Sequence, residues 1–145
     1  MSGSLDDQVV AEARRWLGTP YHHQMAAKGA GCDCLGLIRG VYRAIIGVEP
    51  ETPPPYSPDW GETDPAERLL SAADRHLVRC EDQAFLPGRV VVLRWRQGLS
   101  AKHAGILSDA NTLIHAYDRV GVVEVAFADA WKRRVAGVFR FSKAD

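Results

Sequence analysis

The sequence has little cysteine, no excess of charge of either sign and no long apolar run. Lys and Arg together number 18, as do Asp and Glu, so the formal net charge is zero. A chain without a basic excess gives no electrostatic reason to expect nucleic acid as a partner. No apolar stretch approaches the roughly 18 residues of a membrane-spanning helix, so we expect no membrane insertion. An odd number of cysteines, three, does not suggest a disulfide framework.

The first ten residues, MSGSLDDQVV, are polar and acidic. They contain neither the basic region nor the apolar region of a secretory signal peptide. We therefore expect the protein to be synthesised in the cytoplasm without an export signal of its own.

The order of the hydrophobic patterns predicts an α+β fold. A length of 145 residues suffices for one domain with a core, so we expect a single domain over residues 1–145. Helical spacing of apolar residues predicts helices over Asp6–Leu17, from Cys34 to about Gly47, and over Pro65–Leu77. In the second half, short apolar runs predict a mainly antiparallel sheet of about five strands, and Ala128–Arg134 a helical turn. The predicted strands are Arg89–Trp95, His103–Leu107, Leu113–Tyr117, Val120–Phe127 and Val135–Phe141.

A proline-rich stretch interrupts these patterns at about residues 49–65, which hold six of the eight prolines. We interpret it as a surface excursion within the domain, because the remainder of the chain after it is too small to fold alone. Extended proline-rich segments lose little entropy on docking, so the stretch is either a docking arm for a partner or a plain surface loop. Tyr56 and Trp60 are its candidate interface aromatics.

Cys34 is the first candidate for chemistry, because the glycine-rich run GAGCDCLGL places it at the start of the second predicted helix. The free N–H groups and the dipole of a helix N-terminus favour an anion, which predicts a lowered thiol pKa and a nucleophile. The alternative is a buried structural thiol, since Cys34 shares a helix face with Ile38. Three glycines would let a substrate backbone come close: Gly29, Gly31 and Gly36.

A thiolate needs a base, and histidine is the usual one near neutral pH. His103 and His115 lie in two predicted strands joined by a turn at residues 109–111. Adjacent antiparallel strands could place both imidazoles on one face. His103 would then be the base and His115 the partner that fixes its tautomer. The alternative is two hydrogen-bonded histidines in a half-buried sheet.

The stretches GTPYHHQMAAKGAGCDCLGL, KHAGIL and TLIHAY, in this order, resemble the NlpC-type papain-like cell-wall peptidases. The likeness is closest to the short versions carried by tailed phages and gene-transfer particles. It implies a papain-like fold with N-terminal helices on the sheet. It also implies a cysteine endopeptidase that needs no cofactor or metal and cuts the amide between D-glutamate and the diamino acid of peptidoglycan stem peptides.

Carried over by motif, the resemblance implies a role for each matching residue. Cys34 would be the nucleophile, His103 the base and His115 the orienting residue. The backbone N–H of Cys34 would stabilise the oxyanion, and Tyr21 would contact substrate or oxyanion at the edge of the site.

Several nearby positions depart from the family pattern or stay open. Leu35 replaces a serine, and Arg89 stands where an aspartate is usual. Cys32 is an extra thiol, which we expect to be a small buried residue rather than a ligand or redox group. His22 and His23 come directly after Tyr21 and either line the groove or are solvated loop residues.

The resemblance further implies tail or baseplate proteins as partners and action in the periplasm or cell wall, reached on a phage-like particle. Two other functions stay open. One is a structural tail or baseplate protein with weak or vestigial activity. The other is a zinc site made by Cys32, Cys34, His103 and His115, although their spacing is not that of a zinc finger.

Overall fold

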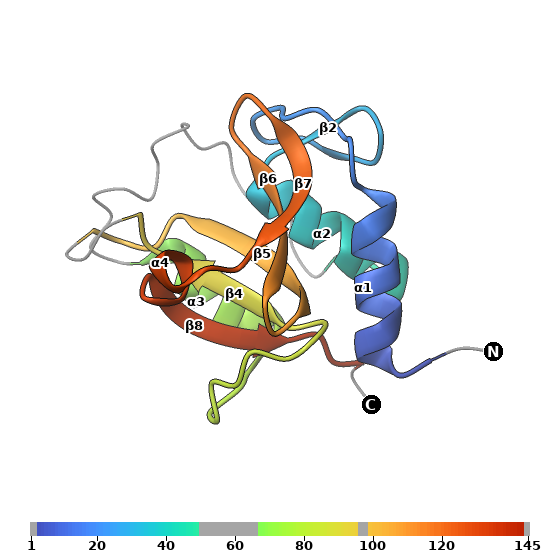
Figure 1. Cartoon of the computed structure of the whole chain (residues 1–145). Helices are drawn as coiled ribbons and strands as arrows, with labels where there is room; N and C mark the ends of the chain where they lie inside the picture. The colour runs from blue at the N-terminus through green and yellow to red at the C-terminus, as the bar shows by residue number, and fades with distance from the viewer. Residues whose placement is uncertain (1–2, 50–66, 96–98, 144–145) are drawn as a thin grey trace.

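Helices from the first half of the chain pack on an antiparallel sheet from the second half (Figure 1). The structure, a computed structural model, describes residues 3–49, 67–95 and 99–143. The helices are α1 (Leu5–Arg15), α2 (Cys34–Ile45), α3 (Arg68–His76) and the single turn α4 (Asp129–Lys132). In these described segments, no helix combines the length and apolar character needed to cross a membrane.

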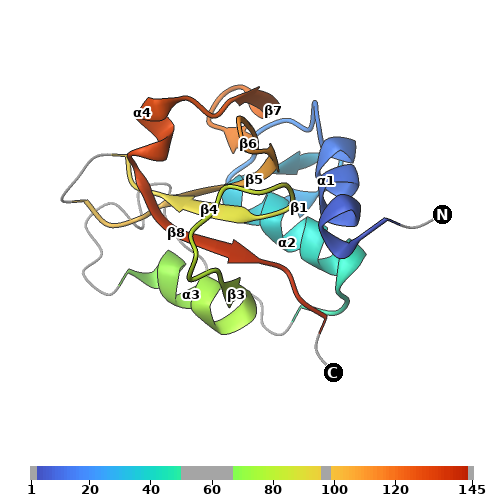
Figure 2. The same ribbon diagram turned by 60° about the horizontal axis from the view of Figure 1, so that its bottom comes forward.

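The main sheet has six strands in the order β3-β8-β4-β5-β6-β7, and every neighbouring pair is antiparallel. A separate two-stranded hairpin joins β1 to β2 ahead of α2. Figure 2 shows α2 behind the sheet and α3 beside β3 and β8, at the β3 edge of the sheet. The strands are β1 (Ala26–Ala27), β2 (Gly31–Cys32), β3 (Val78–Arg79), β4 (Val90–Leu93), β5 (His103–Asp109), β6 (Thr112–Tyr117), β7 (Gly121–Ala126) and β8 (Val135–Arg140).

Both faces of the central strands are buried, which explains the continuous apolar run of β4. Val90 and Val92 point into a core shared with the helices. Val91 and Leu93 point into a second core on the opposite face, where Phe127 and Trp131 pack. A strand buried on both faces has no polar alternation, as expected for an internal strand.

The contact between α1 and α2 depends on a glycine. Trp16, which caps α1, is 2% exposed and lies on Gly40 of α2, where a Cβ atom would be 2.0 Å from the indole. The indole N–H donates to Glu12, whose side chain is 3% exposed and also binds Lys28 of the loop before β2. Arg15 also donates to this carboxylate, so burial of Glu12 is compensated by three donors.

The predicted α+β fold is confirmed, with helices on an antiparallel sheet that contains all five predicted strands. The sheet has one strand more than predicted, the two-residue β3, and the predicted loop Tyr21–Gly31 contains most of the β1–β2 hairpin. Elements this short bury too few side chains to leave a periodic pattern. The proline-rich stretch, with Tyr56 and Trp60, falls almost entirely on residues 50–66, which lie outside the described residues.

Gly40→Ala is expected to lower the free energy of unfolding by about 2 kcal/mol, because the new methyl group overpacks the indole of Trp16. Alanine is the better helix former by about 1 kcal/mol, so propensity alone predicts the opposite sign. Urea denaturation measures the difference. The exposed Ala44→Gly in the same helix reports the propensity effect alone, and a Gly40→Ala protein at least as stable as wild type would show that α1 and α2 are not in this contact.

Candidate active site

A cleft of about 510 Å³ opens where β5 and β6 part. The two strands are paired from Asp109–Thr112 to Ile106–Ile114, and His103 and His115 lie beyond the last pair. The cleft is lined by Tyr21, His23, Asp33, Cys34, Leu35, Trp95, Lys102, His103, Ala116, Tyr117, Asp118 and Arg119. The structure therefore brings the predicted site residues Tyr21, Cys34 and His103 to one cavity, with His115 hydrogen-bonded directly behind His103.

Cys34 is fixed by the N-terminus of α2. Asp33 caps the helix, since its Oδ1 accepts the Gly36 N–H at 2.7 Å and its Oδ2 accepts the Gln24 N–H at 2.7 Å. One carboxylate thus joins the helix to the loop that carries Tyr21. The Cys34 thiol is 9% exposed and donates to the Lys102 carbonyl at 3.8 Å, while the N–H of Ala104 donates to its sulfur. The sulfur therefore lies against the backbone on both sides of His103.

Two of the three glycines near Cys34, Gly31 and Gly36, make close contacts within the protein, and that the glycines admit a substrate backbone stays a prediction. A Cβ on Gly36 would lie 1.8 Å from the Met25 carbonyl oxygen, and one on Gly31 would lie 2.5 Å from the His22 ring. Gly29 adopts a φ of 78° in the hairpin turn. Gly36 lets the backbone at Met25 approach α2, and Gly31 leaves room for the His22 ring.

The two imidazoles form a hydrogen-bonded pair. His103 Nε2 lies 2.8 Å from His115 Nδ1, and the two side chains are 4% and 2% exposed. Gly105 makes room for Leu113 and His115, because a Cβ there would lie 2.7 Å from the Cδ1 of Leu113 and 3.0 Å from the Cβ of His115. The bond uses Nε2 of His103 and leaves its Nδ1 as the ring nitrogen for another partner.

Burial disfavours a positive charge on His103 or His115 and a negative charge on the Cys34 thiol. It lowers the pKa of His103 to about 3 and that of His115 to about 4. It also raises the pKa of the Cys34 thiol to about 12, and the adjacent Asp33 carboxylate adds to this effect. The prediction that the helix N-terminus lowers the thiol pKa is therefore wrong: burial and the capping carboxylate outweigh the N–H donors of Ala104 and Leu35. Burial thus favours the neutral form of the Cys34 thiol and of both imidazoles.

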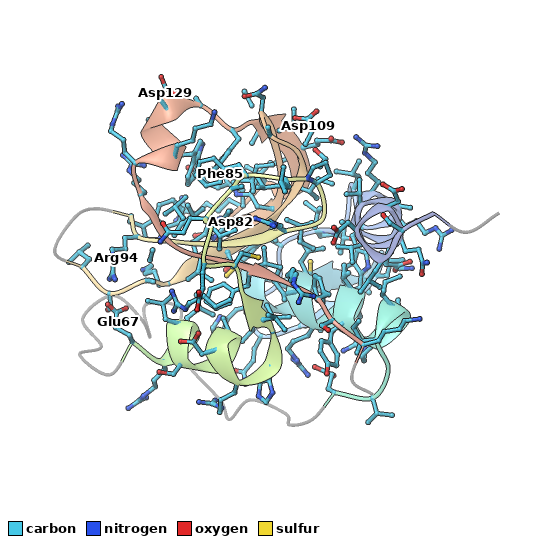
Figure 3. All side chains as sticks on the ribbon, turned by 90° about the horizontal axis from the view of Figure 1, so that it is seen from below. Glu67, Asp82, Phe85, Arg94, Asp109 and Asp129 are labelled. Carbon is cyan, nitrogen blue, oxygen red and sulfur yellow. The ribbon has the colours of Figure 1, made fainter. Side chains whose placement is uncertain are left out.

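The segment that leads into His103 is clamped by an ion pair. Arg94 donates to Glu67 at 2.5 Å and to the Leu99 carbonyl at 2.7 Å, and Glu67 accepts the Ala101 N–H at 2.8 Å. Figure 3 shows Arg94 and Glu67 together at one edge of the molecule. The pair holds the residues before β5 against the start of α3, so it positions the strand end that carries His103.

The structure gives the location of the other residues that the sequence motifs singled out. Tyr21 is half-buried, and burial raises the pKa of its phenol. Cys32 is completely buried in the core, as predicted, while His23 lines the cleft and His22 is exposed outside it. Leu35 also lines the cleft.

Arg89 donates to Asp82 and to the Ala84 carbonyl, both at 2.8 Å. It therefore takes part in a loop contact and is not among the residues that line the cleft.

Metal ligation is a separate question. Within residues 3–49, 67–95 and 99–143, no group of three or more His, Cys, Asp or Glu side chains is placed to hold a metal ion. The four residues considered for zinc do not form such a group in this geometry.

Three aromatic residues that sequence reasoning did not connect with the site surround the imidazoles. Trp95 stacks on His103, with ring centroids 4.9 Å apart and an interplanar angle of 22°. Trp131 lies 5.5 Å from His115, and Tyr117 lies 5.4 Å from it. Tyr117 follows His115 by two residues in β6, so strand alternation places both on one face, whereas Trp95 and Trp131 come from the residues after β4 and from α4, and only the strand order and register could have linked them to the site.

The chain is similar to proteins of one family. The sequence model of the NlpC/P60 family matches residues 18–140. A curated relative, the gamma-DL-glutamyl hydrolase of Bacillus subtilis (strain 168), is 28% identical over 140 residues, which cover 95% of this chain. The chain spans 30% of the length of that relative.

Solved structures share the fold. An NlpC/P60 family protein of Bacillus cereus ATCC 10987 superposes with a TM-score of 0.66 at 20% identity, over 97% of this chain and 41% of that one. The NlpC/p60 domain of the peptidoglycan hydrolase SagA gives a TM-score of 0.64 at 19% identity, over 94% of this chain and 98% of the domain. At such identities the likeness is evidence for the fold alone.

The buried histidines predict a loss of stability in mild acid. Because both pKa values are lowered in the folded state, the unfolded chain binds more protons below about pH 6.5. The free energy of unfolding should fall from pH 6.5 towards pH 4 by up to about 1.4 kcal/mol per pH unit for each histidine. His115→Asn should make this slope shallower in urea denaturation across the range, whereas His22→Gln, at an exposed position, should leave it unchanged. Equal slopes for wild type and His115→Asn would contradict the burial of the pair.

Proposed function

This chain belongs to the NlpC/P60 family, and we propose that it is a cysteine peptidase that hydrolyses the amide between D-glutamate and the diamino acid of peptidoglycan stem peptides. The observation that carries the proposal is the 2.8 Å bond between His103 Nε2 and His115 Nδ1, next to a cleft that contains the Cys34 thiol. The similarity to the gamma-DL-glutamyl hydrolase supports this bond as the target.

The hydrogen bond fixes the tautomers that a base at His103 requires. For Nδ1 of His103 to accept a proton, the ring must carry its own proton on Nε2. That N–H then donates to Nδ1 of His115, which must be unprotonated, so His115 carries its proton on its own Nε2. His115 thereby acts as an acceptor that orients His103, the division of labour of a nucleophile, a base and an orienting residue.

The reaction follows from these assignments. The Cys34 S–H bond turns from the Lys102 carbonyl to Nδ1 of His103, and the thiol loses its proton as the sulfur attacks the scissile carbonyl carbon. The Cys34 N–H and the Tyr21 hydroxyl stabilise the oxyanion. The imidazolium then protonates the leaving amine, which leaves a thioester on Cys34, and water, deprotonated by His103, hydrolyses it.

The burial of Cys34 and His103 determines how the proton passes between them. Neither thiolate nor imidazolium is stable by itself in this cleft, so the two charges form together and stabilise each other. The site is therefore a neutral general-base pair at rest, rather than a preformed ion pair.

Delivery to the cell wall is part of the proposal. We place the enzyme on a phage-like or gene-transfer tail, with tail or baseplate proteins as partners and action in the periplasm or cell wall. The support for this is the resemblance of the sequence motifs to tail-associated relatives. A structural tail protein with vestigial activity is the alternative that the next experiment separates.

Cys34→Ala should abolish cleavage of purified stem peptides, with a loss of about 10³-fold or more in kcat/KM. Mass spectrometry of the products identifies the bond. Cys80→Ala, which removes a cysteine buried in the other core, should keep activity and serves as the matched control, with Cys32→Ala beside it. Cleavage that survives Cys34→Ala would show that Cys34 is not the nucleophile, and a wild type that cuts nothing would favour the structural tail protein.

The Nδ1 contact makes a sharper prediction at His115. Asparagine carries Oδ1 on Cγ, as histidine carries Nδ1, so His115→Asn keeps an acceptor at the same place. We expect His115→Asn to retain most of kcat, and His115→Leu to lose about 10²-fold or more. His115→Gln, whose acceptor lies one bond farther out, should fall between them. If Asn and Leu are equally impaired, His115 does not act as an acceptor for His103.

A further inference from the structure

An aromatic cover, defined here as Trp95, Tyr117 and Trp131, encloses the two imidazoles. Its members contact one another as well as the histidines: Trp95 lies 5.8 Å from Trp131 and 6.3 Å from Tyr117 between ring centroids. Trp131 also lies 6.1 Å from His103. Three segments distant in sequence thus meet on the same pair of rings.

The cover forms the boundary between the imidazoles and solvent. The histidines are almost completely buried, whereas Trp95 and Trp131 are half-buried and Tyr117 is 41% exposed. Trp95 and Tyr117 also line the cleft. The exclusion of water from His103 and His115 therefore depends on these rings.

Trp95 occupies a special place in the cover, because it is the ring that lies parallel to His103. Leu93 pairs with His103 across β4 and β5, and Trp95 comes two residues later, which brings its indole over the imidazole. A stacked ring blocks rotation of the imidazole out of its plane. That plane is the one in which Nε2 reaches His115.

We infer that Trp95 is a positioning residue for His103: its indole holds the imidazole in the plane that directs Nε2 to His115 and Nδ1 to Cys34, and its face stabilises the imidazolium formed during attack. The inference rests on the proposed peptidase function for its catalytic meaning, while the positioning itself is a property of the free protein. An indole face attracts a stacked cation, more strongly where water is excluded.

The neighbouring charges show why such stabilisation matters. Lys102 and His115 both oppose a positive charge on His103, and burial opposes it further. The other titratable groups that line the cleft with His103 are Cys34 on α2, Tyr21, His23 and Asp33 on the preceding loop, Tyr117 at the end of β6, and Asp118 and Arg119 after it. In the proposed mechanism Cys34 becomes anionic only together with His103, so the stacked indole of Trp95 is a neutral group that favours the imidazolium in advance.

The test compares Trp95→Phe and Trp95→Leu in the full chain. Leucine fills space without a π face, whereas phenylalanine can still stack. In ¹⁵N-NMR of the free proteins, wild type and Trp95→Phe should show His103 and His115 each as a single Nε2–H tautomer. In Trp95→Leu, His103 should show a mixture of tautomers and titrate at a lower pH than in wild type, because the ring face that favours the imidazolium is lost.

Activity gives the second readout. On stem peptide, Trp95→Leu should lower kcat by about tenfold, the scale of one cation–π contact in a desolvated site, and Trp95→Phe should recover most of it. Phe85→Leu is the packing control. Phe85, which is labelled in Figure 3, packs edge-on against Phe127 in the second core, with ring centroids 5.1 Å apart. The substitution should therefore lower stability and leave the tautomers and the titration of His103 unchanged.

The outcomes separate the inference from the proposed function. If Trp95→Leu only lowers stability, with His103 titrating and tautomerising as in wild type, Trp95 is a packing residue and the inference is wrong even when the enzyme is active. If wild type cleaves no stem peptide but Trp95→Leu still disturbs the His103 tautomer, the positioning stands and the proposed function fails.

Discussion

The bond between His103 Nε2 and His115 Nδ1 is the interaction on which the rest of the site depends. It is made by two side chains that are almost completely buried, so each polar nitrogen needs a partner within the protein. Pairing the rings satisfies two nitrogens at once and leaves Nδ1 of His103, the atom that the proposed mechanism assigns to Cys34. The parting of β5 and β6, the absence of a side chain at Gly105 and the aromatic cover all serve to make this one bond fit.

A second constraint is the Asp33 carboxylate, which holds the residues around Cys34 in place but disfavours the thiolate form of Cys34. By accepting the N–H groups of Gly36 and Gln24, it fixes the start of α2 to the loop that brings Tyr21 to the cleft. By placing a negative group beside Cys34, it also raises the pKa of the thiol. In the proposed mechanism this thiol is well placed but protonated at rest, and His103 has to take its proton.

Much of this arrangement could be predicted from the sequence, because its signals are strong and local. Periodicity and turn residues predict the helix with Cys34 at its start and the strands that contain His103 and His115. Antiparallel pairing of those two strands predicts that the two histidines lie close together. The thiol pKa could not be predicted, since burial depends on what packs over Cys34 from elsewhere in the chain. The same is true of Trp95 and Trp131, which reach the imidazoles only through the β4–β5 register and the return of the chain through α4.

The central claim is that peptide cleavage passes through a thioester on Cys34, and intact-mass spectrometry of the protein quenched in acid during turnover tests it most directly. We predict an adduct with the mass of the acyl portion of the stem peptide, located by proteolysis on the fragment that contains Cys34 and absent from Cys34→Ala. An acyl adduct on any other residue, or continued turnover after Cys34 has been alkylated, would contradict this claim.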